Sequence, residues 1–76
     1  MVTYTIERTI AEISSSGRGA KRLTLTSWNG QPAKLDLRVW VTDDAGQEKP
    51  GRGITLTEAE AFTLAAELQI YFAAAK

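Results

Sequence analysis

Residues 34–56, with the sequence KLDLRVWVTDDAGQEKPGRGITL, carry the strongest structural signal in this chain of 76 residues. Successive side chains of a strand point to opposite faces of a sheet, and the strict alternation over residues 34–41 therefore predicts a strand with two unlike faces. The apolar residues, which we expect to face the core, are Leu35, Leu37, Val39 and Val41. The other face, which we expect to point outward, carries Lys34, Asp36, Arg38 and Trp40. A tryptophan beside two cations is costly to leave in water, so this face predicts a docked ligand.

The segment after this strand predicts a turn, a loop and a helix. Residues 43–46 (Asp-Asp-Ala-Gly) are typical of a turn, residues 47–53 read as a polar, basic connection, and residues 54–56 as a short fourth strand. Thr57 and Glu60 have the spacing of a capping box, in which each side chain satisfies a free backbone N–H of the first helical turn. Ala, Leu and Glu dominate from there, and neither Gly nor Pro intervenes, so the helix is expected to run to about Ala74.

The segment before residue 34 predicts two more strands. Residues 2–13 are rich in Thr, Ile, Val and Tyr, and their alternation falters near Arg8 and Thr9, which indicates a bulge or bend there. A flexible turn over residues 14–19 separates them from a second strand at about residues 21–28. In that strand Leu23 and Leu25 are expected to face the core, and the opposite face carries Arg22, Thr24, Thr26 and Trp28. Asn29-Gly30 is a strong hairpin signal.

These elements predict one α+β domain over residues 1–76, with a four-stranded antiparallel sheet followed by one C-terminal helix (β-β-β-β-α). The helix is apolar around most of its girth, and one sheet covers only one side of a helix. A domain of this size without disulfides often gains stability by oligomerising. We therefore expect a homodimer formed through the helix. The residues expected at its interface are Leu64, Leu68, Tyr71 and Phe72.

Composition excludes several classes of function. The chain has neither cysteine nor histidine, so thiolate or imidazole metal sites and the usual catalytic sets are missing, and we expect no metal, no cofactor and no enzymatic activity. No apolar run approaches the roughly 20 residues that span a bilayer, which predicts a cytoplasmic or nucleoid-associated protein, or a nuclear one in a eukaryote. The net charge is zero, yet residues 14–42 carry +4 and residues 54–75 carry −3. This asymmetry indicates an anionic partner for one face.

The order of elements and the motifs Asp36-Leu37-Arg38, KPGRGITL at residues 49–56 and Ser27-Trp28-Asn29 resemble the transcriptional coactivator family typified by positive cofactor 4, and most closely its bacterial YdbC-type branch. The resemblance is strongest over residues 21–62. It implies a helix-mediated dimer that binds single-stranded DNA, largely without sequence preference, across its β-surfaces. The chain departs from the family at Asn29 and Gln31, where lysines are common, and lacks a second basic residue after Arg52. These departures imply weaker binding and a shallower salt dependence.

Single-strand binders combine phosphate-contacting cations with aromatic faces on which bases stack, each stacked base being worth roughly 1–3 kcal/mol. The residues predicted to bind nucleic acid are Arg18, Lys21, Arg22, Trp28, Lys34, Arg38, Trp40 and Arg52. Structural roles stay open as alternatives. Either tryptophan could fill the core edge or the dimer seam, and Arg38 could form only an ion pair with Asp36. Lys49 and Arg52 could serve only to solubilise their loop.

The sequence thus predicts binding of single-stranded nucleic acid, with DNA favoured and RNA left open as the alternative, and a role in transcription, replication or repair. A protein-interaction module that docks transcription or replication proteins on the outer β-face is the competing hypothesis. A minimised scaffold of the same fold, with weak or no nucleic-acid binding, is the third.

Overall fold

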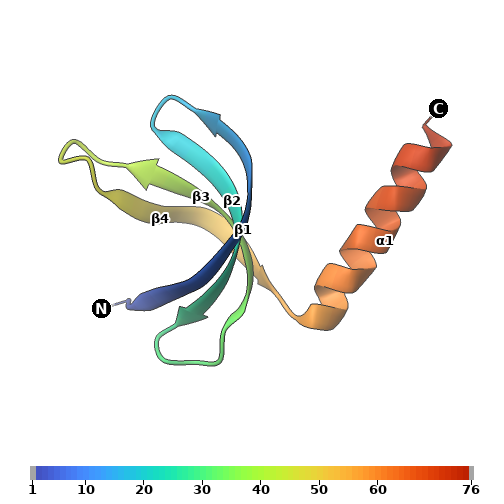
Figure 1. Cartoon of the computed structure of the whole chain (residues 1–76), viewed down its shortest axis with the longest axis horizontal. Coiled ribbons are helices and arrows are strands. Elements are labelled where there is room, and N and C mark those ends of the chain that lie inside the picture. Colours follow the sequence, from blue (N-terminus) through green and yellow to red (C-terminus); the bar gives the residue numbers. More distant parts are fainter. Residues whose placement is uncertain (1, 76) are drawn as a thin grey trace.

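The computed structural model describes residues 2–75, which form four strands and one helix. Their bounds are β1 (Tyr4–Ser16), β2 (Gly19–Trp28), β3 (Lys34–Thr42), β4 (Glu48–Leu56) and α1 (Glu58–Ala74). The strands make one antiparallel sheet in the order β1-β2-β3-β4, and α1 follows the last strand (Figure 1). The predicted α+β class and its β-β-β-β-α order are confirmed.

The hairpin turn and the helix start lie where the sequence predicts them. Asn29 and Gly30 both have positive φ, at 50° and 75°, as a tight hairpin turn requires. At the start of α1, the Thr57 hydroxyl accepts a hydrogen bond from the Glu60 amide at 3.1 Å. The Glu60 carboxylate accepts one from the Thr57 amide at 2.8 Å, so the capping box is complete.

Two strand boundaries differ from the prediction. β1 continues to Ser16, so the turn expected over residues 14–19 is confined to its middle. β4 begins at Glu48, and the prediction of a loop over residues 47–53 is wrong. The fourth strand is therefore three times as long as residues 54–56 alone, and the whole Gly-rich return belongs to the sheet.

The glycines of β4 explain why this strand pairs so closely with β3 and why the sequence predicted a loop here. A Cβ atom on Gly53 would lie 2.5 Å from the carbonyl oxygen of Leu37 and 2.6 Å from Cβ of Arg38. A Cβ atom on Gly51 would lie 2.9 Å from the carbonyl oxygen of Val39. Only glycine permits this close approach of two backbones. Because glycine has no side chain to alternate, the sequence pattern of this strand resembles that of a loop.

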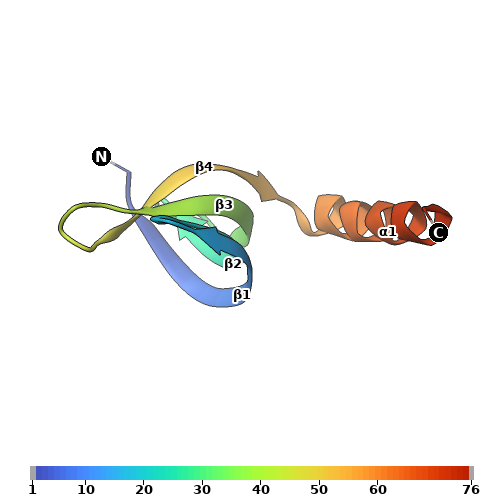
Figure 2. The same cartoon turned by 90° about the horizontal axis from the view of Figure 1, so that it is seen from above.

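The sheet is strongly bent. The pairing of β1 with β2 shifts register three times, between Ile6 and Arg8, between Thr9 and Ala11, and between Glu12 and Ser14. Each bulge bends its strand and increases the local twist. The irregularity predicted near Arg8 and Thr9 is confirmed. Figures 1 and 2 show the result: β1, β2 and β3 bow toward α1 in their middle and their ends turn away from it, whereas the end of β4 leads into α1.

Aromatic contacts identify the concave face of this bend. Tyr4 lies opposite Trp28 in the sheet, whereas Trp40 lies opposite Ala20, eight residues away along β2. In an unbent sheet these positions would be about 26 Å apart, at roughly 3.3 Å per residue. The Tyr4 ring nevertheless lies 5.4 Å from the rings of both tryptophans. The face that carries these rings is therefore folded inward.

The concave face forms the core of the single chain. All residues that are buried among those described lie on it: Ala20, Thr24, Thr26, Asp36 and Trp40. The prediction that this face points outward is wrong, because the bend closes it on itself. The opposite, convex face carries the leucines and valines expected in the core, and these are only half-buried or exposed, with Val41 45% and Ile54 54% exposed.

Helix α1 covers neither face. It contacts only β3 and β4 and extends away from the convex side of the sheet (Figure 1). None of its described residues is buried, and its large apolar side chains are 39–79% exposed. The single chain thus leaves two apolar surfaces uncovered, one on the convex face and one on the helix.

Candidate nucleic-acid interface

The Asp36 carboxylate organises the concave face. It is fully buried and accepts hydrogen bonds from Trp28 Nε1 at 3.0 Å and from Arg38 Nε and Nη2, each at 3.0 Å. Positions 36 and 38 share a face because strand side chains alternate, and the Asn-Gly hairpin brings the end of β2 beside them. Three N–H donors, two of them on the charged guanidinium of Arg38, offset the free-energy cost of burying the carboxylate. We call Trp28, Asp36 and Arg38 the indole clamp.

The Arg38 guanidinium packs against the indole of Trp28, and little of its side chain is exposed to solvent. Its Cζ lies 4.7 Å from the centre of the Trp28 ring, in a cation–π arrangement. Its Nη1 donates to the Gly51 carbonyl at 2.9 Å, which ties the clamp to β4. Three of the five guanidinium N–H groups are thus used within the chain, and two are left for a ligand. The ion pair with Asp36, one of the alternatives from the sequence, is present, and it positions both clamp side chains.

A hollow of about 190 Å³ lies beside the indole clamp. Its lining residues are Trp28, Gln31, Pro32, Lys34, Arg38 and Thr55. The half-buried indole supplies an aromatic surface, and exposed Lys34 has no ion-pair partner within residues 2–75. An aromatic surface next to an uncommitted cation suits an unpaired base with its phosphate.

Arg22 lies on the same face and is bound to carboxylates. Its Nη1 and Nη2 donate to the two carboxylate oxygens of Glu48 at 2.9 and 2.7 Å, and its Nε lies 3.5 Å from Glu12. The hydrogen bonds with Glu48 raise the pKa of Arg22, and the same bonds lower the pKa of Glu48. Arg18 pairs likewise with Asp44 at the turns. These cations are therefore partly neutralised within the chain.

Trp40 is not an exposed stacking surface. Its side chain is only 2% exposed, and its Nε1 has no hydrogen-bond partner among the described residues. The expectation that this ring faces outward is wrong, because the bend folds Tyr4 onto it at 5.4 Å. Tyr4 is a clamp neighbour that the sequence reasoning missed. Only the register of β1 against Trp28 would have identified it, and a bulged strand does not reveal its register in the sequence.

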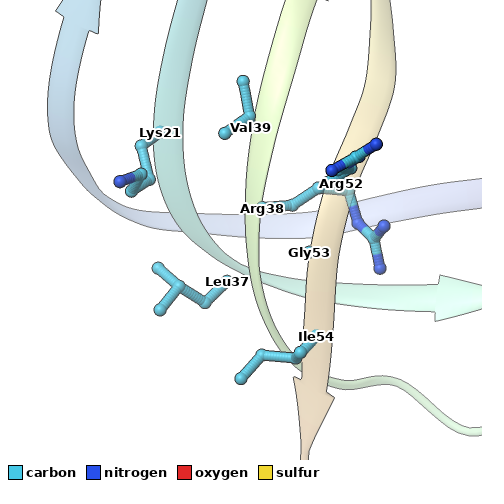
Figure 3. Close-up of a pocket in the computed structure, with 7 residues that line it drawn as sticks. All are labelled: Lys21, Leu37, Arg38, Val39, Arg52, Gly53 and Ile54. Carbon is cyan, nitrogen blue, oxygen red and sulfur yellow. The ribbon is translucent and has the colours of Figure 1, made fainter.

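The predicted cations do not form one surface. Lys21 lies opposite Val39, on the convex side of the sheet. Together with Arg52 it borders a hollow of about 410 Å³ whose apolar lining includes Leu37 and Ile54 (Figure 3). Arg22 and Lys34 lie on the concave side, together with Arg38 and the rest of the indole clamp. Arg18 lies in the β1–β2 turn. The residues predicted to bind nucleic acid are therefore divided between the two faces, with Lys21 on the side opposite the indole clamp.

The predicted interface residues of α1 are free in the single chain. Leu64 and Leu68 are 39% and 46% exposed, and Tyr71 and Phe72 are 64% and 62% exposed. The rings of the last two pack edge to face at 5.2 Å. The homodimer through these residues stays a prediction.

Residues 2–75 offer no group of three His, Cys, Asp or Glu side chains that could hold a metal ion. Within the same residues, no helix has the length and apolarity needed to cross a membrane.

Comparison with known proteins gives two matches. The family model described as Transcriptional Coactivator p15 (PC4) matches residues 16–66. An uncharacterised protein of Treponema pallidum (strain Nichols) is 42% identical over 62 residues, which cover 80% of this chain and 69% of that protein. The region matched by the family model contains the indole clamp, the hairpin and the Gly-rich strand β4. The family match therefore covers most of the candidate interface, and Tyr4 lies outside its bounds.

Proposed function

The chain belongs to the family of the transcriptional coactivator p15 (PC4), and on this premise we propose that it binds single-stranded DNA through the concave face of its sheet. Nucleic-acid binding is the activity that family membership supports in general. Single strands and the absence of a strong sequence preference are the finer parts of the proposal. We expect such binding to act in transcription, replication or repair.

The observation that carries the proposal is the fixed indole of Trp28. Asp36 holds its N–H, Arg38 lies on its ring, and a hollow with Lys34 at its border adjoins it. A ring held in place before binding loses little conformational entropy when a base stacks on it. Every base has a π-face, whereas few groups here could read base edges, so the expected binding is tolerant of sequence.

Salt dependence is expected to be shallow. Of the concave-face cations, Lys34 is uncommitted, Arg38 retains two N–H groups, and Arg22 is paired with Glu48. Each phosphate neutralised on a single strand contributes about −0.7 to the slope of log K against log salt. About two phosphates per chain then give a slope of about −1.4.

A homodimer completes the proposed protein. The convex face and α1 both expose apolar surface, and a second copy of the same chain is always at hand to cover it. Pairing through Leu64, Leu68, Tyr71 and Phe72 would cover the helix. Two linked concave faces would also raise the affinity for a strand long enough to reach both.

Fluorescence anisotropy of a labelled oligo-dT tests the proposal. The parent is expected to bind saturably at low salt, and Trp28→Ala is expected to bind about tenfold or more weakly, because it removes the stacking ring. Lys34→Ala is expected to weaken binding and flatten the salt slope. Its matched control is Arg8→Ala, which removes an exposed cation that lies opposite Leu25 on the convex side.

The result would contradict the proposal if oligo-dT gave no saturable binding, or if folded Trp28→Ala bound like the parent. The competing hypothesis, a protein-docking module, is favoured by one observation: the apolar hollow of about 410 Å³ on the convex face. Salt separates the two. Binding through phosphates weakens with added salt, whereas docking through an apolar hollow barely responds.

A further inference from the structure

The strongest feature outside the indole clamp is the ion bridge between Arg22 on β2 and Glu48 on β4. These strands are not neighbours, since β3 lies between them. Arg22 lies opposite Arg38, Glu48 lies opposite Thr42, and Trp40 is midway between those two positions on β3. All these residues share the concave face. The bridge therefore crosses β3 at the level of the buried Trp40.

The geometry of the bridge resembles the way that arginine holds a phosphate. Two parallel N–H···O bonds of 2.9 and 2.7 Å join one guanidinium to two oxygens of one anion. A phosphodiester presents the same pair of acceptor oxygens, and arginine binds both anions in this forked manner. The side chains of Arg22 and Glu48 are 23% and 44% exposed, so an incoming anion can reach the pair.

We propose that Glu48 is a built-in competitor for nucleic-acid phosphate: it occupies Arg22 in the free protein, and a phosphodiester of the bound strand replaces its carboxylate. This inference rests on the proposed binding of single strands and adds a regulatory element to that site. Glu12, 3.5 Å from the Arg22 Nε, keeps the guanidinium oriented during the exchange. The exchange lowers the affinity for nucleic acid, because the Glu48 carboxylate must leave before a phosphate binds to Arg22. It favours ligands with a high density of phosphates.

A purely structural bridge makes a different prediction. Because the bridge crosses the sheet at Trp40, it could serve only to seal that ring from water. Removing the charge of Glu48 would then lower the free energy of unfolding and leave the affinity for oligo-dT unchanged. Competition predicts a gain in affinity instead.

Glu48→Gln is the decisive variant, measured by anisotropy with labelled oligo-dT over a range of salt concentrations. We expect binding about fivefold tighter than in the parent at low salt, which corresponds to loss of one partly exposed ion pair. The salt slope should stay close to that of the parent, because Arg22 contacts one phosphate in either complex. Arg22→Ala alone is expected to bind more weakly than Glu48→Gln, because it removes the guanidinium that receives the phosphate.

Two controls separate competition from a general change of charge. Glu7→Gln removes the same charge from an exposed residue of β1 that has no ion pair within residues 2–75. It is expected to leave the affinity unchanged. In the Arg22→Ala background, Glu48→Gln should give no gain in affinity for oligo-dT, because no guanidinium is left for Glu48 to occupy.

The outcomes are distinct. Tighter binding by Glu48→Gln that disappears without Arg22 supports the inference. A parent that binds oligo-dT with Glu48→Gln no tighter overturns the competition and leaves the proposed function standing. An equal gain in Glu7→Gln overturns it as well, since bulk charge then explains the effect. If neither the parent nor Glu48→Gln binds, the proposed function and this inference both fail.

Discussion

The two faces of the sheet differ in whether their side chains find partners within the same chain. On the concave face, the Asp36 carboxylate has three donors, Arg38 bridges to β4, and Arg22 has two carboxylates. On the convex face and on α1, apolar side chains remain exposed, and none of the described ion pairs crosses that side of the sheet. The concave face is a polar and aromatic core within one chain, whereas the convex face leaves apolar surface exposed.

This difference separates two sources of stability. Hydrogen bonds and ring contacts fix the shape of the concave face within one chain. Burial of apolar area, which stabilises by about 25 cal/mol per Å², is small within the single chain, and in the proposed homodimer contacts between chains would supply it. Substitutions on α1, substitutions on the concave face and acid each alter one of these sources, and we expect their effects to decrease in that order.

Leu68→Glu is expected to have the largest effect. A carboxylate in the centre of the apolar stripe of α1 would be buried without a partner in the dimer, which costs several kcal/mol. We expect the dimer of 8.3 kDa chains to dissociate, with loss of the cooperative unfolding transition. Size-exclusion chromatography with light scattering measures the mass. Gln69→Glu adds the same charge one residue along and serves as the matched control. A parent that runs as a stable monomer would refute the dependence on a second chain.

Asp36→Asn is expected to rank second, because it acts within the concave face. The amide keeps the shape of the side chain but leaves the half-buried Arg38 guanidinium without its counter-charge, and breaking a fully buried pair on one side costs about 3–5 kcal/mol, which is an upper bound here. Urea unfolding should report this loss. The affinity for oligo-dT should fall with the loosened indole, while the mass stays that of the parent. A folded variant with unchanged urea midpoint and affinity would show that the clamp organises nothing.

Acid is expected to have the smallest effect. The hydrogen bonds from Arg22 lower the pKa of Glu48, and the amide of Gln47 together with Lys49 lowers the pKa of Asp43. A carboxyl group whose pKa is lower in the folded state stabilises the fold above its unfolded pKa, and this contribution is lost as pH falls through the folded pKa. We expect the urea midpoint to decline modestly from about pH 5 to pH 3, and less so in Glu48→Gln. An identical pH profile in that variant would rule out the bridge as the cause.

The sequence predicted the parts of this protein that depend on local rules. Alternation placed Asp36 and Arg38 on one face, Asn29-Gly30 set the hairpin that brings Trp28 beside them, and Thr57 marked the helix start. The full bend was not predictable, because faltering alternation indicated an irregularity only near Arg8 and Thr9, and the bulge between Glu12 and Ser14 has no distinctive motif. Without the full bend, burial of Trp40 was only an open alternative, and the alternation of β3 favoured an outward-facing ring.

The ion bridge was missed for a related reason. Glu48 lies in a segment whose glycines give it the pattern of a loop, so no strand position was expected for it. Its partner Arg22 is two strands away, and a pairing across an intervening strand depends on the register of both hairpins. The charge of Arg22 was therefore counted as free, whereas the folded chain neutralises it.

The bulges of β1 have a consequence for solubility. β1 is a long outer strand of 13 residues with isoleucines that are 40–57% exposed, and a flat strand of this kind would invite further chains to pair with its free amide and carbonyl groups. Three interruptions of the ladder keep that border from offering a straight template. The same curvature that encloses the aromatic rings thus discourages open-ended stacking into fibrils, and growth is expected to stop at a closed assembly.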